Sequence, residues 1–218
     1  DVYKRQVMMP RASHLIAENK EDEFSRLIQK SYDFTLAIAL PMTIGLIFCA
    51  PSLITALCGV KFEHSILPSQ IIAPIILMVA ISNVFGIQVL FPKGKINIVT
   101  LSCGIGAVAD LILNLCLIPF FSYIGTSIAY LGAEVATTVS MYFIGRKYIP
   151  IIYFKKSHLT YALGCIVMAF ALYGLSLLQL PTLTILLLQG CCGVLAYFII
   201  LCICKDEMLV QILLKIKR

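Results

Sequence analysis

The sequence contains about six long apolar stretches, each separated from the next by a polar or proline-marked break. They cover residues 31–58, 66–91, 96–118, 123–144, 159–178 and 183–204. A helix needs about 20 apolar residues to cross about 30 Å of hydrocarbon, whereas a membrane β-barrel would show alternating segments of about ten residues. Only 13% of the 218 residues are charged, against about 25% in soluble proteins. We therefore expect an all-α, polytopic membrane bundle of about six transmembrane helices.

Basic residues lie at alternate ends of these stretches. They precede the first stretch and follow the second, fourth and sixth, and include Arg11, Lys20, Arg26, Lys30, Lys93, Lys95, Arg146, Lys147, Lys155, Lys156, Lys205, Lys215, Lys217 and Arg218. The intervening links contain only Lys61. Because Lys and Arg favour the cytoplasmic side, this alternation predicts a multi-pass protein of the cytoplasmic membrane with a cytoplasmic C-terminus. The net charge of +6 therefore marks helix ends and does not indicate a nucleic-acid partner.

These features divide the chain into five parts. Residues 1–6 are polar and form a candidate non-native scar, and residues 7–30 are predicted to be the end of a truncated membrane helix followed by a cytoplasmic interfacial connector. Residues 31–148 form the main group of transmembrane helices, and residues 149–204 add a further transmembrane hairpin. Residues 205–218 have the pattern of a basic amphipathic tail that lies on an anionic leaflet. Membrane lipids are thus the first partners that we expect.

The first apolar stretch is interrupted by Pro41, Gly45 and Pro51. Each of these residues is able to free backbone groups and to bend a helix, and such bends often serve transporters. The three positions are therefore candidate conformational hinges. The alternative for each one is a residue tolerated because neighbouring helices pack against it.

Two acidic residues, Asp110 and Glu134, lie inside otherwise apolar stretches. An ionisable side chain there costs about 2.5 to 3.5 kcal/mol by insertion scales, so it needs a partner, a proton or a task. At 1.5 Å per residue the two acids lie about 12 and about 16 Å below the outer ends of their helices. Asn114 shares the helix face of Asp110, and Tyr130 and Thr138 flank Glu134.

This pattern leaves two interpretations open. In the first, the acids contact substrate or couple transport to a proton or a sodium ion, because two nearby carboxylates at low dielectric do not both ionise cheaply. In the second, hydrogen bonds satisfy each acid separately and only hold helices together. Asn83, a polar residue deep in the second stretch, joins the substrate or coupling-ion candidates.

Catalytic, cofactor and metal sites are not indicated. The three histidines, His14, His64 and His158, fall in or beside loops, and neither a Ser-His-Asp set, an HExxH motif nor a glycine-rich phosphate loop occurs. The nine cysteines lie inside or at the ends of apolar stretches, and their spacing lacks the two pairs of a zinc site. We expect neither an enzyme nor a bound cofactor.

Several segments resemble bacterial oligosaccharide flippases of the multidrug/oligosaccharidyl-lipid/polysaccharide (MOP) exporter superfamily. These segments are residues 7–13, Pro41 with residues 45–46, residues 57–62, residues 114–119 and residues 124–129. The most specific of them is the Asn-Leu-x-Leu-Ile-Pro sequence at 114–119. Family members often have Asn one turn before this sequence, where the present chain has Asp110.

The resemblance implies two pseudo-symmetric helical lobes around a central cavity. Such a protein moves a lipid-linked oligosaccharide of the O-antigen or capsule type from the cytoplasmic to the outer leaflet by alternating access, in cell-surface polysaccharide biosynthesis. This chain would form most of the second lobe, with the first lobe in a missing N-terminal part. Two alternatives stay open: a cation-coupled multidrug or small-molecule exporter of the same superfamily, and a membrane scaffold without transport.

Overall fold

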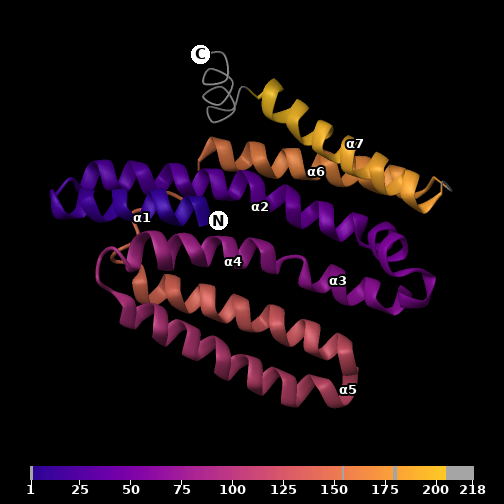
Figure 1. Ribbon diagram of the computed structural model, residues 1–218, viewed down its shortest axis with the longest axis horizontal. Coiled ribbons are helices and arrows are strands. Elements are labelled where there is room, and N and C mark those ends of the chain that lie inside the picture. The colour runs from indigo at the N-terminus through magenta and orange to yellow at the C-terminus, as the bar shows by residue number, and fades with distance from the viewer. Residues whose placement is uncertain (1, 154, 179–180, 205–218) are drawn as a thin grey trace. The chain divides into compact units, whose positions relative to one another are not determined.

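The computed structural model describes residues 2–153, 155–178 and 181–204 (Figure 1). In this part of the chain all regular elements are helical. The α-helices are α1 (Val2–Ala17), α2 (Glu21–Cys58), α3 (Ile66–Ile72), α4 (Ile75–Asn83), α5 (Ile96–Gly145), α6 (Lys156–Ser176) and α7 (Thr182–Ile203). A 3-10 helix, η1 (Val60–Ser65), precedes α3, and a π-helix, η2 (Val84–Leu90), follows α4. The all-α prediction is confirmed.

Five helical runs are long and apolar enough to cross a membrane, judged by length and composition, within the described residues. One of them, α5, has 50 residues and contains a reversal at Ser122, where φ is 48° and ψ is −124°. That backbone conformation turns the chain back on itself one residue after Phe121, inside the link predicted at residues 119–122. With α5 counted as two crossings, the structure agrees with the expected bundle of about six transmembrane helices.

The chain folds into two units. Unit 1 comprises Asp1–Thr35 and Ile75–Tyr153, and unit 2 comprises Leu36–Pro74 and the described residues beyond Tyr153. The helix α2 contributes to both units. The five-part division of the sequence stays a prediction, and its basic tail at 205–218 lies outside the described residues.

In unit 1, the two halves of α5 pack closely against each other. A Cβ added at Gly106 would collide with Thr137 Oγ1, and one added at Gly125 would lie 2.6 Å from the carbonyl oxygen of Leu117. Ala129, two turns from Thr137, is fully buried. Small residues on both halves thus let the two backbones approach, as is common between membrane helices.

Polar and cation–π contacts hold the loops of unit 1 at the charged start of α2. Lys93 Nζ donates a hydrogen bond to Glu21 Oε2 over 3.1 Å and lies 4.9 Å from the ring centroid of Phe24. Gln29 exchanges two hydrogen bonds with the backbone of Ile152, accepting from its N–H over 2.8 Å and donating to its carbonyl over 3.3 Å. The links on either side of α5 are therefore fastened to the same end of α2.

An aromatic cluster lies at this end of unit 1. It consists of Tyr32 on α2, Phe85 on η2, Tyr142 on α5 and Tyr153, with ring-centroid distances from 5.3 Å (Tyr142–Tyr153) to 6.5 Å (Phe85–Tyr153). Tyr32 and Phe85 are buried. Such aromatic pairs add about 0.5 to 1.5 kcal/mol each beyond area burial. The cluster fixes η2 against α2 and α5, which sets the position of the π-helix.

In unit 2, α6 and α7 pack through glycines. A Cβ at Gly164 of α6 would lie 2.9 Å from the ring of Tyr197, and a Cβ at Gly193 of α7 would lie 3.2 Å from the side chains of Leu172 and Met168. A Cβ added at Gly45 of α2 would lie 3.1 Å from the Met168 side chain. Glycine on each helix thus receives a large side chain from a neighbour.

Two prolines of α2 leave backbone carbonyls without their helical N–H donor, and side chains of other helices donate to these carbonyls instead. Pro41 has no N–H to donate to the Ala37 carbonyl, and the Tyr197 hydroxyl donates to that oxygen over 2.8 Å. Pro51 likewise leaves the Ile47 carbonyl, which accepts from Gln70 Nε2 over 2.9 Å. α2 continues as one helix through both prolines. The hinge role of Pro41, Gly45 and Pro51 stays a prediction.

Candidate functional site

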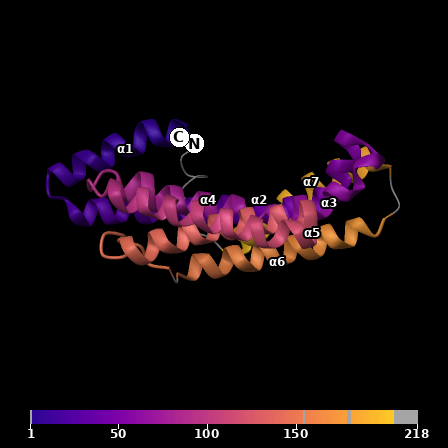
Figure 2. The same ribbon diagram turned by 90° about the horizontal axis from the view of Figure 1, so that it is seen from below.

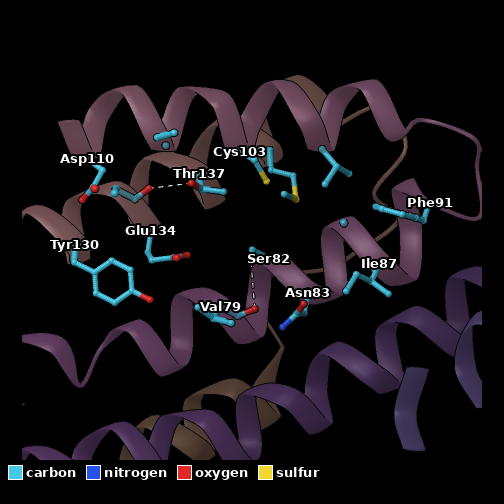
Figure 3. A pocket seen from close by; sticks show the side chains of 16 residues that line it. Val79, Ser82, Asn83, Ile87, Phe91, Cys103, Asp110, Tyr130, Glu134 and Thr137 are labelled. Carbon is cyan, nitrogen blue, oxygen red and sulfur yellow. Dashed lines mark hydrogen bonds between the residues drawn. The ribbon is translucent and has the colours of Figure 1, made fainter. Parts of the chain in front are cut away.

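A cavity of about 540 Å³ lies inside unit 1, between α4 with η2 and the two halves of α5 (Figure 3). The ribbon of Figure 1 and its turned view in Figure 2 place these elements in the chain. The polar residues that line the cavity are Ser82, Asn83, Asp110, Tyr130, Glu134 and Thr137. The large apolar residues that line it are Val79, Ile87, Phe91, Val99 and Met141. The volume falls in the range of about 300 to 1,000 Å³ that small-molecule sites occupy.

One wall of the cavity is formed by the π-helix η2. The Phe91 N–H donates to the Gly86 carbonyl over 2.9 Å, a bond that spans five residues and widens the helix. A Cβ at Gly86 would lie 3.4 Å from Met141 Sδ and 3.7 Å from Val99 Cγ1, so α5 packs directly against the backbone there. π-Helical turns inside α-helices are frequent at functional sites. The widened turn is the local distortion that borders the cavity.

The structure brings the two intramembrane acids to the same cavity, from opposite halves of α5. Close contacts bracket them: Gly106 meets Ala133 and Thr137 on one side, and a Cβ at Gly132 would lie 2.6 Å from Leu113 Cδ1 on the other. Asp110 and Glu134 lie between these levels and both line the cavity. Figure 3 shows Asp110, Glu134 and Tyr130 at one end of it, with Ile87 and Phe91 toward the other.

Asn114 does not line the cavity, but it orients one of the acids. Its Nδ2 donates to Asp110 Oδ1 over 3.0 Å and to the Asp110 backbone carbonyl over 2.9 Å. Both contacts run along a single helical turn. The amide therefore holds the Asp110 carboxylate in a fixed rotamer and leaves its Oδ2 to accept a further bond.

Thr138 also lies outside the lining and acts on the helix that carries Glu134. Its hydroxyl is buried and lies 2.9 Å from the Glu134 backbone carbonyl and 3.3 Å from the Met78 carbonyl of α4. This group joins the second half of α5 to α4 across one wall of the cavity. Thr138 therefore connects two helices beside the acid and does not itself line the cavity.

Asn83 and Tyr130 line the cavity as the sequence candidates Asp110 and Glu134 do. The lining residues Ser82 and Thr137 were not among those candidates. Their hydroxyls donate to carbonyls of their own helices, Ser82 to Val79 over 3.2 Å and Thr137 to Ala133 over 3.0 Å. Thr137 follows Gly125, Ala129 and Ala133 at spacings of four in the sequence, and this stripe of small residues is the one signal that could have included it.

The charge of the cavity is one-sided. Two carboxylates line it, and its lining holds no Lys, Arg or His among the residues that the structure describes. An anionic group such as a phosphate finds no basic partner on this lining, whereas a cation finds two carboxylates. The lining is therefore suited to binding a cation or a group rich in hydroxyls.

Comparison with known proteins gives the family. The family model described as "Lipid II flippase MurJ" matches residues 4–192. This chain belongs to the lipid II flippase family. No curated protein matches it. Members of a flippase family are transporters, which agrees with the prediction that the chain is not an enzyme.

A solved structure described as "Lipid II flippase MurJ, inward closed conformation" shares the fold of this lipid II flippase family member. The TM-score is 0.78 and the sequence identity is 17% over 94% of the chain. The chain spans 44% of the length of that structure. The predicted resemblance to flippases of lipid-linked sugars thus holds at the level of the family, and the family matched is that of lipid II and not one of the O-antigen or capsule type.

Proposed function

We propose that this chain forms the second, membrane-embedded part of a flippase that moves a lipid-linked sugar precursor from the cytoplasmic to the outer leaflet of the bacterial cytoplasmic membrane. The observation that supports this function is an open, polar and acidic cavity lined by apolar membrane helices in a member of the lipid II flippase family. Ionisable groups within membrane helices commonly mark substrate or ion pathways.

A first lobe, encoded before this chain, would complete the transport path. The match to 44% of the solved flippase supports that arrangement. The carrier lipid bears phosphates, and the cavity in unit 1 offers them no basic partner. The phosphate-binding groups would therefore come from the first lobe, whereas this lobe would contact the uncharged or cationic parts of the headgroup.

The residues in and beside the cavity would have different roles in binding. Glu134 and Asp110 would contact the headgroup or a coupled proton or sodium ion, and Asn83 and Tyr130 would bind sugar hydroxyls. Asn114 would keep the Asp110 carboxylate oriented. Bending of α2 at its prolines would accompany alternating access, and the basic ends of the helices and the tail would face the cytoplasm.

The nature of the lipid-linked precursor is the finer part of the proposal. The family description favours the peptidoglycan precursor lipid II, and the alternative is a surface-polysaccharide precursor. Deletion of the gene followed by analysis of both polymers separates them. Loss of surface polysaccharide with intact peptidoglycan would favour the alternative, and drug sensitivity with both polymers intact would favour a small-molecule exporter.

The transport test uses the full-length protein in proteoliposomes. A fluorescent lipid-linked precursor is accessible to a membrane-impermeant quencher only in the outer leaflet, so the initial rate of quenching reports flipping. Glu134→Gln removes the charge and keeps the shape, and we expect the rate to fall about tenfold or more, the size of a lost charged hydrogen bond. Glu63→Gln on exposed η1 is the matched control and should keep the wild-type rate. Unchanged rates in both Glu134→Gln and Asp110→Asn would overturn the role of the cavity.

A further inference from the structure

The second proline of α2 leaves a carbonyl whose hydrogen bond comes from outside the helix. Pro51 has no N–H for the Ile47 carbonyl, and Gln70 Nε2 of α3 donates to that oxygen over 2.9 Å. Unlike a bond within one helix, this bond breaks when α3 moves relative to α2. The partner of the Ile47 carbonyl therefore depends on how the helices of unit 2 are packed.

A second glutamine of unit 2 has an unsatisfied amide oxygen. Gln189 of α7 is 1% exposed, and its Oε1 has no hydrogen-bond donor among the residues that the structure describes. Buried polar side chains are normally hydrogen-bonded, and one that is not carries a desolvation cost. Inside a membrane no bulk water relieves that cost. A different packing of the helices that gave this amide a partner would remove part of it.

The spacing of α7 places Gln189 at the depth of the Ile47 carbonyl. α2 and α7 run in opposite directions (Figure 1), and the Tyr197 hydroxyl of α7 donates to the Ala37 carbonyl of α2 over 2.8 Å. Measured from this bond, Gln189 lies about 12 Å back along α7 and Ile47 lies about 15 Å further along α2, at 1.5 Å per residue. The two depths differ by about 3 Å, which is within the reach of a glutamine side chain.

Gln189 also lies on the face of α7 that packs toward α2 and α6. It shares the buried face of α7 with Gly193 and Tyr197, at spacings of four. A Cβ added at Gly193 would lie 3.2 Å from the Met168 side chain of α6, and one added at Gly45 of α2 would lie 3.1 Å from the same side chain. The three helices thus meet one turn away from Gln189.

We propose that the Ile47 carbonyl exchanges its donor between Gln70 of α3 and Gln189 of α7, and that this exchange switches α2 between two conformations. In the present conformation α3 holds the carbonyl and the Gln189 amide oxygen is unsatisfied. In the other, α2 has moved away from α3, and Gln189 Nε2 donates to the released carbonyl. Loss of either glutamine then favours the conformation that uses the other. The inference rests on the proposed flippase function only in assigning the exchange to the transport cycle.

The test measures the separation of α2 and α3 in the full-length protein. Spin labels replace the exposed side chains of Met42 and Leu67, through Met42→Cys and Leu67→Cys in a background without other cysteines. Pulsed electron paramagnetic resonance in lipid nanodiscs gives their distance distribution. Gln70→Met and Gln189→Met each remove one donor with little change in volume. We expect them to shift the ratio of short to long distances in opposite directions, each by about threefold, the size of an interhelical hydrogen bond in a membrane protein.

The two prolines supply the controls. Pro51→Ala gives the Ile47 carbonyl a helical donor, so in that background both glutamine variants should leave the distance distribution unchanged. In the Pro41→Ala background they should keep their opposite effects. Shifts in the same direction, or shifts that persist in Pro51→Ala, would overturn the exchange. A lower thermal midpoint of Gln70→Met with an unchanged distance distribution would reveal a purely structural bond and would also overturn it.

The flipping assay separates this inference from the proposed function. If both conformations take part in transport, Gln70→Met and Gln189→Met should each slow flipping in proteoliposomes by about threefold or more. Opposite distance shifts with wild-type flipping rates in both variants would overturn the assignment to the transport cycle. If the wild type flips no precursor, the proposed function fails, and the distance distributions still decide whether the exchange occurs.

Discussion

The bond between Tyr197 and the Ala37 carbonyl offers a quantitative test of how α2 tolerates a proline. The hydroxyl donates over 2.8 Å to the carbonyl that Pro41 leaves without its helical partner. Tyr197→Phe removes the donor but keeps the buried ring that packs on Gly164. An unsatisfied carbonyl costs about 1 to 3 kcal/mol in water-soluble proteins, and interhelical bonds in a membrane protein average about 0.6 with a maximum of about 1.7 kcal/mol. We expect Tyr197→Phe to lower the free energy of unfolding by about 1 to 1.5 kcal/mol.

Pro41→Ala restores the missing N–H, so in that background the Ala37 carbonyl has a helical donor whatever residue 197 is. Tyr197→Phe should then cost less than about 0.5 kcal/mol, which gives a coupling energy of roughly 1 kcal/mol in a double-mutant cycle. The free energies come from reversible unfolding of the purified full-length protein in mixed micelles, followed by far-ultraviolet circular dichroism.

The second proline of α2 supplies the matched control. Pro51→Ala restores a donor for the Ile47 carbonyl, which is the partner of Gln70. Tyr197→Phe should therefore keep its full cost in the Pro51→Ala background. An equal cost of Tyr197→Phe in the wild-type and Pro41→Ala backgrounds would refute the idea that the hydroxyl replaces the missing N–H.

Two further predictions concern the hairpin of α5 and the site. Gly106→Ala places a methyl group against Thr137 and should lower the free energy of unfolding by about 1 to 3 kcal/mol. The control is Gly104→Ala, whose methyl group meets open space and should leave the thermal midpoint nearly unchanged. Equal thermal midpoints of the two variants would contradict the close approach of the two halves of α5. Asn114→Leu releases the Asp110 carboxylate and should slow flipping about tenfold with little change in thermal midpoint, so an unchanged flipping rate would exclude the orienting role.

The helices and the hairpin could be predicted from the sequence because their signals are local. Apolar runs long enough to span a membrane mark the crossings, and the reversal at Ser122 falls in a short link after Pro119. Small residues at spacings of four, such as Gly125, Ala129 and Ala133, are a local signal of tight helix packing. Which helices use those surfaces depends on long-range contacts such as Gly106 with Thr137, and these became visible only in the structure.

The π-helix and the proline partners had no sequence signal. Residues 84–90 have the composition of an ordinary apolar helix, and the aromatic packing of Phe85 against α2 and α5 accompanies the wider turn. Pro41 predicts that the Ala37 carbonyl is freed, but the side chain that fills the gap lies 160 residues away in sequence. The cavity could be predicted only in part. The depths of Asp110 and Glu134 follow from their positions in the sequence, but whether both line one cavity depends on how the helices pack.

The most direct test of the proposed function is to locate the precursor's headgroup on the full-length protein. A lipid-linked precursor with a photoreactive diazirine in its headgroup is bound to the protein in proteoliposomes and irradiated, and the crosslinked peptides are identified by mass spectrometry. We expect adducts on the segments that line the cavity, residues 79–91, 99–110 and 130–141, and their loss in Glu134→Gln. Adducts confined to other parts of the protein, with equal yield in the variant, would contradict the proposed function.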